Sequence, residues 1–158
     1  MPQAYTTDLN RSPDPSRHRA LVQSILDFWR VQDVEQTLSG LSEGILYQLY
    51  TFHNARPSLQ LLTGKDAVRT MMFEVLAQFD YLHYEPTVLD VSGGIGRVQI
   101  QFDLRHRASG ERLTGSKRQF YVIGDHVITR INEFHDTALV AAFLRLTQST
   151  GESVRFRL

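Results

Sequence analysis

The chain has 158 residues, which suits one domain with a sizeable core. Its 17 lysines and arginines balance 17 aspartates and glutamates, so no net charge attracts nucleic acid or an anionic membrane. There is no cysteine, which excludes disulfides within the chain and cysteine-bound zinc, and no apolar run is long enough to span a bilayer. We therefore expect a cytoplasmic protein with neither nucleic acid nor membrane as a partner.

The N-terminal half predicts helices that alternate with short strands. Residues 1–14 are polar, and we expect them to form a flexible arm. The first helix should begin at Asp14 and Pro15, because proline is tolerated in the first helical turn. Apolar spacing then predicts further helices at 33–41 and 65–79, and strands at 45–52, 59–62 and 82–92.

The clearest pattern lies between residues 98 and 105, where apolar and polar residues alternate strictly. This period of two predicts a strand that is buried on one side. A second strand should follow at 113–123. Gly124 and Asp125 then predict a two-residue hairpin loop, with Ile123 and His126 as cross-strand neighbours. A third strand at 126–135 and a helix at 136–146 complete the pattern.

This order of elements predicts an α+β fold in which helices cover one face of a curved antiparallel sheet. Such a sheet, wrapped on the N-terminal helices, forms a cone with an internal pocket. We expect the cone domain to occupy residues 15–146. A C-terminal tail should follow at 147–158.

Three short segments carry a resemblance to a known family. They are Phe-Trp-Arg at 28–30 before Gln-Asp-Val at 32–34, the stretch 64–69 that opens the third helix, and Asn-Glu-Phe-His-Asp at 132–136. Over roughly residues 20–146 the chain resembles the SnoaL-like branch of the nuclear transport factor 2-like superfamily. The resemblance implies a small-molecule pocket in the cone and pairing of two chains through the sheet. The fold hosts isomerases, cyclases, dehydratases, epoxide hydrolases and carrier proteins, so it does not fix the function.

The candidate catalytic residues are Asp103 and Asp136, with Asn54 and Gln101 as polar groups that orient a substrate. They resemble the polar set of limonene epoxide hydrolase, although Gln101 stands where that enzyme has an arginine. Each aspartate also has a structural interpretation. Asp136 precedes a helix and is a natural N-cap, and Asp103 lies on the polar side of its strand.

Further candidate substrate contacts are Tyr50, His53, Tyr121 and Asn132. The acid–base aspartate of the SnoaL cyclases has no counterpart, because the nearest residues here are Gln119 and Phe120. The histidines lack metal-ligand spacing, and no glycine-rich phosphate motif occurs. We therefore expect neither a metal nor another cofactor.

Two functional hypotheses follow. The first is an acid–base enzyme of isomerase, cyclase or hydrolase type that acts on an apolar or amphipathic molecule. The second is a non-catalytic module for ligand binding or dimerisation. The direction of the Asp103 carboxylate, into the pocket or away from it, distinguishes them. We also expect a homodimer joined through the sheet, because the outward-facing residues mix amide, aromatic and aliphatic side chains.

Overall fold

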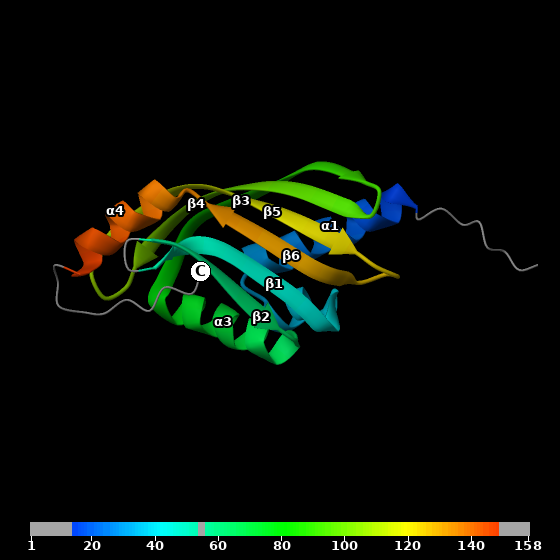
Figure 1. Cartoon of the computed structure of the whole chain (residues 1–158), viewed down its shortest axis with the longest axis horizontal. Helices are drawn as coiled ribbons and strands as arrows, with labels where there is room; N and C mark the ends of the chain where they lie inside the picture. The colour runs from blue at the N-terminus through cyan, green and yellow to red at the C-terminus, as the bar shows by residue number, and fades with distance from the viewer. Residues whose placement is uncertain (1–13, 54–55, 149–158) are drawn as a thin grey trace, which may run out of the picture.

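The computed structural model describes residues 14–53 and 56–148, which form four helices and six strands (Figure 1). The helices are α1 (Pro15–Arg30), α2 (Val34–Ser39), α3 (Lys65–Gln78) and α4 (Thr137–Gln148). The strands are β1 (Leu41–His53), β2 (Arg56–Thr63), β3 (Phe79–Ser92), β4 (Ile95–His106), β5 (Arg112–Ile123) and β6 (Ile128–His135). Of these helices, none has the length and apolar character needed to cross a membrane. Nearly all of the predicted N-terminal arm and most of the tail lie outside the described residues.

The strands form one curved sheet in the order β2-β1-β6-β5-β4-β3 (Figure 1). Neighbouring strands are antiparallel except β1 and β6, which run parallel. The helices α1 and α3 lie against one face of this sheet. The predicted α+β cone is therefore confirmed, and the parallel pair is an addition to the antiparallel sheet that we expected.

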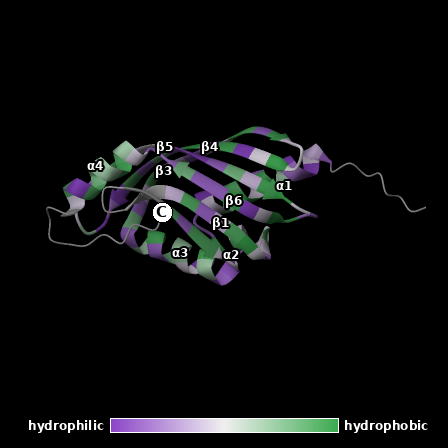
Figure 2. Ribbon diagram, in the orientation of Figure 1, coloured by the Kyte–Doolittle hydropathy of each residue, from purple (hydrophilic) through white to green (hydrophobic). Residues whose placement is uncertain are grey.

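We call the face against α1 and α3 the inner face and the opposite one the outer face. The alternation in β4 places Val98, Ile100, Phe102 and Leu104 inward, where all four are buried. Gly96 precedes them on the same face, and a β-carbon there would lie 3.1 Å from Val22 Cγ2 of α1. In Figure 2 hydrophobic and hydrophilic residues alternate along the strands, as the period of two requires.

The loop between β5 and β6 differs from the prediction. The Gly124 amide donates to the Val127 carbonyl oxygen at 2.9 Å, and Ile123 pairs with Ile128 rather than with His126. His126 adopts a left-handed conformation with φ of 66°. The two-residue turn is therefore wrong, and the loop has four residues. This register keeps both isoleucines buried on the inner side of the sheet.

Aspartate caps set three of the helix starts. The side chain of Asp14 accepts from the Ser16 amide at 3.0 Å, and that of Asp33 accepts from the Gln36 amide at 3.1 Å. Asp136 caps α4 in the same way, with its Oδ1 3.1 Å from the Leu139 amide nitrogen. The structural interpretation of Asp136 as an N-cap is thus confirmed.

Candidate functional site

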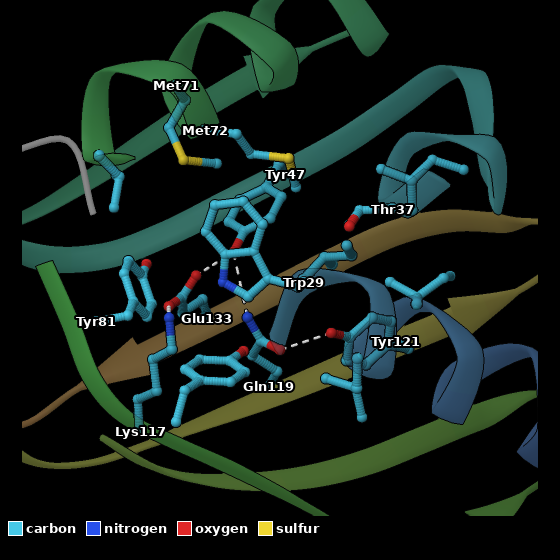
Figure 3. A pocket seen from close by; sticks show the side chains of 16 residues that line it. Trp29, Thr37, Tyr47, Met71, Met72, Tyr81, Lys117, Gln119, Tyr121 and Glu133 are labelled. Atoms are coloured by element: carbon cyan, nitrogen blue, oxygen red, sulfur yellow. Dashed lines mark hydrogen bonds and ion pairs between the residues drawn. The ribbon is translucent and has the colours of Figure 1, made fainter. Parts of the chain in front are cut away.

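A cavity lies between the inner face of the sheet and the helices α1, α2 and α3 (Figure 3). It encloses about 530 Å³ of space between atoms, part of it open to solvent. Only about 40 Å³ of this can hold the centre of a water-sized molecule, so the cavity is narrow. The lining residues are Ile25, Leu26, Trp29, Thr37, Leu41, Tyr47, Met71, Met72, Val75, Tyr81, Tyr84, Lys117, Gln119, Tyr121, Ile131 and Glu133.

Most of the cavity wall is apolar. Trp29 of α1 meets Tyr81 of β3 edge to face, with ring centroids 5.7 Å apart. Met71 and Met72 come from α3 and also line the cavity (Figure 3). Methionine is flexible and adapts to irregular shapes, so this wall can move to admit a ligand larger than the observed space.

The polar part of the cavity centres on Glu133 of β6, whose side chain is 1% exposed. One carboxylate oxygen, Oε1, contacts both the Lys117 ammonium and His135 Nε2, the latter at 3.0 Å. The other oxygen, Oε2, accepts a hydrogen bond from the Tyr47 hydroxyl. Lys117 comes from β5 and its Cα lies opposite that of His135, while Tyr47 reaches Glu133 from the parallel strand β1.

Opposing effects set the charge of this carboxylate. Burial raises the pKa of Glu133, but the Lys117 ammonium and the hydrogen bond from His135 outweigh it and hold the pKa well below its usual range. Burial and the nearby Glu133 charge both raise the pKa of the Tyr47 hydroxyl. Glu133 is therefore ionised and Tyr47 is a neutral donor.

Further hydrogen bonds extend this cluster along the sheet (Figure 3). The Gln119 amide nitrogen donates to the Tyr47 hydroxyl at 3.2 Å, and the Tyr121 hydroxyl donates to the Gln119 amide oxygen at 2.6 Å. The donors in this series of hydrogen bonds run in one direction, from Tyr121 through Gln119 and Tyr47 to Glu133. The Lys117 ammonium also lies 5.9 Å from the centre of the Tyr84 ring.

The geometry gives Lys117 a specific chemical capacity. An ammonium has three N–H donors, and the contact with Glu133 Oε1 does not use all three. The rest can reach an oxygen atom of a molecule in the cavity. Because the site is largely apolar, such a donor stabilises a developing negative charge more strongly than it would in water.

Asp103 and Gln101 lie on the outer face, away from this cavity. The Asp103 carboxylate accepts from Arg112 Nε at 3.0 Å and from Thr114 Oγ1 at 2.9 Å. The hydrogen bond from Arg112 is the main cause that lowers the pKa of Asp103. Both residues line a shallow surface hollow that also includes His83.

The other predicted site residues are divided between the two faces. Tyr50 stacks on Phe134 on the outer face with ring centroids 4.3 Å apart, and Asn132 accepts there from Arg130 Nε at 3.2 Å. Tyr121 alone among the candidates with described side chains lines the cavity. The side chain of His53 and the whole of Asn54 lie outside the described part of the chain. The structure thus does not bring the predicted set together.

Glu133, Lys117 and Tyr47 are not among the site residues predicted from the sequence. A signal for Glu133 was present, because it alternates with Ile131 and His135 along β6 and shares their inner face. Lys117 likewise alternates with Gln119 and Tyr121 along β5. Among the described residues no group of three acidic or histidine side chains could hold a metal ion.

Comparisons with known proteins agree at the level of the fold. No family model and no curated protein matches the sequence. Among solved structures, an NTF2-like protein from Burkholderia xenovorans has a TM-score of 0.70 at 14% identity, covering 83% of this chain and 98% of that one. A candidate isomerase from Bacillus subtilis has a TM-score of 0.68 at 14% identity, covering 87% and 95%. A candidate polyketide cyclase from Xanthomonas campestris has a TM-score of 0.65 at 16% identity, covering 82% and 98%. The chain therefore has the fold of SnoaL-like and NTF2-like proteins, as its sequence resemblance predicted.

Proposed function

We propose that the protein binds a small apolar or amphipathic molecule in the cone cavity and converts it by acid–base chemistry, as an isomerase, cyclase or hydrolase. The observation that carries this proposal is the ionised Glu133 buried between Lys117 and Tyr47. Buried ion pairs rarely contribute net stability, whereas perturbed ionisable groups in a cavity are typical of functional sites. The candidate cyclases and isomerases that share the fold give the proposal further support.

In this proposal the ligand places an oxygen atom beside Lys117. The apolar body of the ligand lies between the α1 and α3 side chains, such as Trp29 and Met72. The Lys117 ammonium stabilises negative charge on the ligand oxygen, and Glu133 holds the ammonium in place. The neutral Tyr121 hydroxyl can accept a further hydrogen bond from a ligand hydroxyl.

A non-catalytic binding module is the second candidate function. The position of Asp103 favours it, because the carboxylate first chosen as catalytic faces away from the cavity. Asp103 on the outer face and Asp136 at the C-terminal end of β6 stay candidates for chemistry. The two functions differ in turnover and not in binding.

A ligand screen with matched variants tests the proposal. Terpenoid, steroid and polyketide-like compounds are screened by thermal shift, and those that bind are followed for conversion. The double variant Lys117→Met/Glu133→Gln removes both charges together, so neither is left buried alone. We expect it to fold and to lose conversion by a factor on the order of 100 or more. If Asp103→Asn loses conversion and the double variant does not, the reaction takes place on the outer face.

We also propose that two copies of the chain pair through the outer face. Exposed apolar side chains gather there, among them Leu59, Leu61 and Phe134. Tyr50 and Phe120 pack against Phe134 from neighbouring strands. A stable interface buries on the order of 1,200 Å² or more in total. Light scattering at micromolar concentration should give the mass of two chains, and Phe134→Lys should lower it to one.

A further inference from the structure

His135 has a ring nitrogen that the cluster around Glu133 does not use. Its side chain is 3% exposed, and Nε2 lies 3.0 Å from Glu133 Oε1. The other ring nitrogen, Nδ1, is buried and has no hydrogen-bond partner within residues 14–53 and 56–148. Buried polar atoms are almost always hydrogen-bonded, so this atom indicates a partner that the described residues do not supply.

The contact with Glu133 decides where the imidazole carries its proton. An ionised carboxylate only accepts hydrogen bonds, so Nε2 is the protonated nitrogen. In the neutral ring Nδ1 then presents a lone pair. A carboxylate that holds one imidazole nitrogen, while the other is free to take a proton, is the arrangement of catalytic carboxylate–histidine pairs.

A second, smaller cavity adjoins His135. It is lined by Tyr81, Tyr84, Phe102, Leu104, Lys117 and His135 and offers about 10 Å³ for the centre of a water-sized molecule. One water needs roughly 10–15 Å³ by this measure, so the space suits a single water and no larger group. Tyr81, Tyr84 and Lys117 also line the main cavity, so the two spaces share a wall. Lys117 and the two phenols offer polar partners in addition to Nδ1.

We propose that Glu133 and His135 hold one water in this side cavity and activate it to hydrolyse an ester or lactone bound in the main cavity. The inference rests on the proposed function and narrows it to hydrolysis. The water oxygen forms a bond to the carbonyl carbon while its proton passes to His135 Nδ1. The electron pair of the carbonyl π bond moves to its oxygen, beside the Lys117 ammonium. When this intermediate collapses, the carbon–oxygen bond to the alcohol breaks and the alkoxide takes the proton from Nδ1, which leaves acid, alcohol and neutral His135.

Hydrolysis of p-nitrophenyl butyrate and of dihydrocoumarin tests the proposal. His135→Gln is the informative variant, because a glutamine amide can still donate to Glu133 but has no basic nitrogen. We expect wild type to hydrolyse at least one probe, and His135→Gln to be slower by a factor on the order of 100. His18→Gln is the control, since His18 lies two turns before Ile25, the first cavity residue on α1. It should hydrolyse at the wild-type rate.

Two measurements keep the outcome independent of any folding defect. Nitrogen chemical shifts of the imidazole in wild type should show Nε2 protonated and Nδ1 bare. Thermal shift with an apolar dye reports whether His135→Gln still folds and binds. A proton on Nδ1, wild-type turnover in His135→Gln, or no turnover of either probe would overturn the proposal. If any of these results is found and wild type still binds the dye, hydrolysis is contradicted but the proposed ligand cavity is not. If wild type does not bind the dye, the proposed function itself is contradicted.

Discussion

The two faces of the sheet each carry a carboxylate paired with a cationic side chain, but the two ion pairs differ in their exposure to solvent. On the inner face Glu133 and Lys117 are 1% and 11% exposed. On the outer face Asp103 and Arg112 are 14% and 59% exposed. Burial strongly opposes the charge of Glu133, whereas solvent screens the outer pair. Two chemically similar ion pairs therefore differ in how strongly each charge depends on its partner. The inner pair is also held by Tyr47 and His135 in a buried cluster.

The largest difference between the faces should appear when each carboxylate is removed. Glu133→Ala leaves the Lys117 ammonium buried without its partner, so we expect the free energy of unfolding in urea to fall by about 3–5 kcal/mol. Asp103→Ala leaves Arg112 largely in solvent, and its urea midpoint should change far less. Equal losses in the two variants would show that the faces are not different in this respect.

A second test concerns how tightly the helices cover the inner face. A β-carbon at Gly40 would lie 2.7 Å from Ile25 Cδ1, so Gly40→Ala forces a cavity residue of α1 to move. We expect a loss of about 1–3 kcal/mol in the free energy of unfolding. Gly44→Ala is the matched control four residues later in β1, because a β-carbon there meets nothing within 4 Å. A tolerated Gly40→Ala would mean that α1 can shift away from the sheet.

Two tyrosines of β1 point to opposite faces and allow a matched comparison. Tyr47→Phe removes the donor to Glu133 and the acceptor of Gln119, so stability should fall by about 1–2 kcal/mol. Tyr50→Phe keeps the ring that stacks on Phe134 and should change stability by less than about 0.5 kcal/mol. Thermal unfolding of the two variants beside wild type measures both values. A reversed order would place the important hydroxyl on the outer face.

The last difference between the faces concerns acid sensitivity. The folded pKa of Glu133 lies below the ordinary value of 4.5, because Lys117 and His135 outweigh the effect of burial. Its contribution to stability is therefore complete above about pH 4.5 and is lost as the pH falls toward the folded pKa. Glu133→Gln should flatten the loss of stability with acid. Asp103→Asn should flatten it less, and only below about pH 3.8, since the pKa of this exposed pair is lowered from 3.8. Urea midpoints measured between neutral pH and acid distinguish the two slopes.

The sequence predicted the architecture because local patterns determine it. The alternation along β4 predicted which of its residues are buried together, although it left open which face lines the cavity. The aspartates at 14, 33 and 136 marked helix starts correctly. The parallel pairing of β1 with β6 was not predictable in this way. No turn or periodicity joins these strands, which meet only when the whole sheet is assembled.

The site was less predictable because one irregularity in β6 changes which alternate residues of that strand face the cavity. The register with β5 shifts between Val122 and Ile123, so Ile128 and Ile131 are both buried although they differ in parity. Counting from Ile128 would place Asn132 inward, whereas counting from Ile131 places Glu133 inward. A strict period of two therefore does not decide whether Asn132 or Glu133 faces inward. The bulge that decides it has no clear signal in the sequence.

The hydrogen bond between Tyr47 and Glu133 joins residues 86 positions apart and has a consequence for folding during synthesis. A nascent chain whose β6 is still inside the ribosome exposes the edge of β1 and leaves Tyr47 without its acceptor. Such distant pairing is slow, because the intervening chain must be ordered before the contact forms. The intermediate therefore presents an open strand edge to other chains, and chaperone protection should matter most until β6 has left the ribosome.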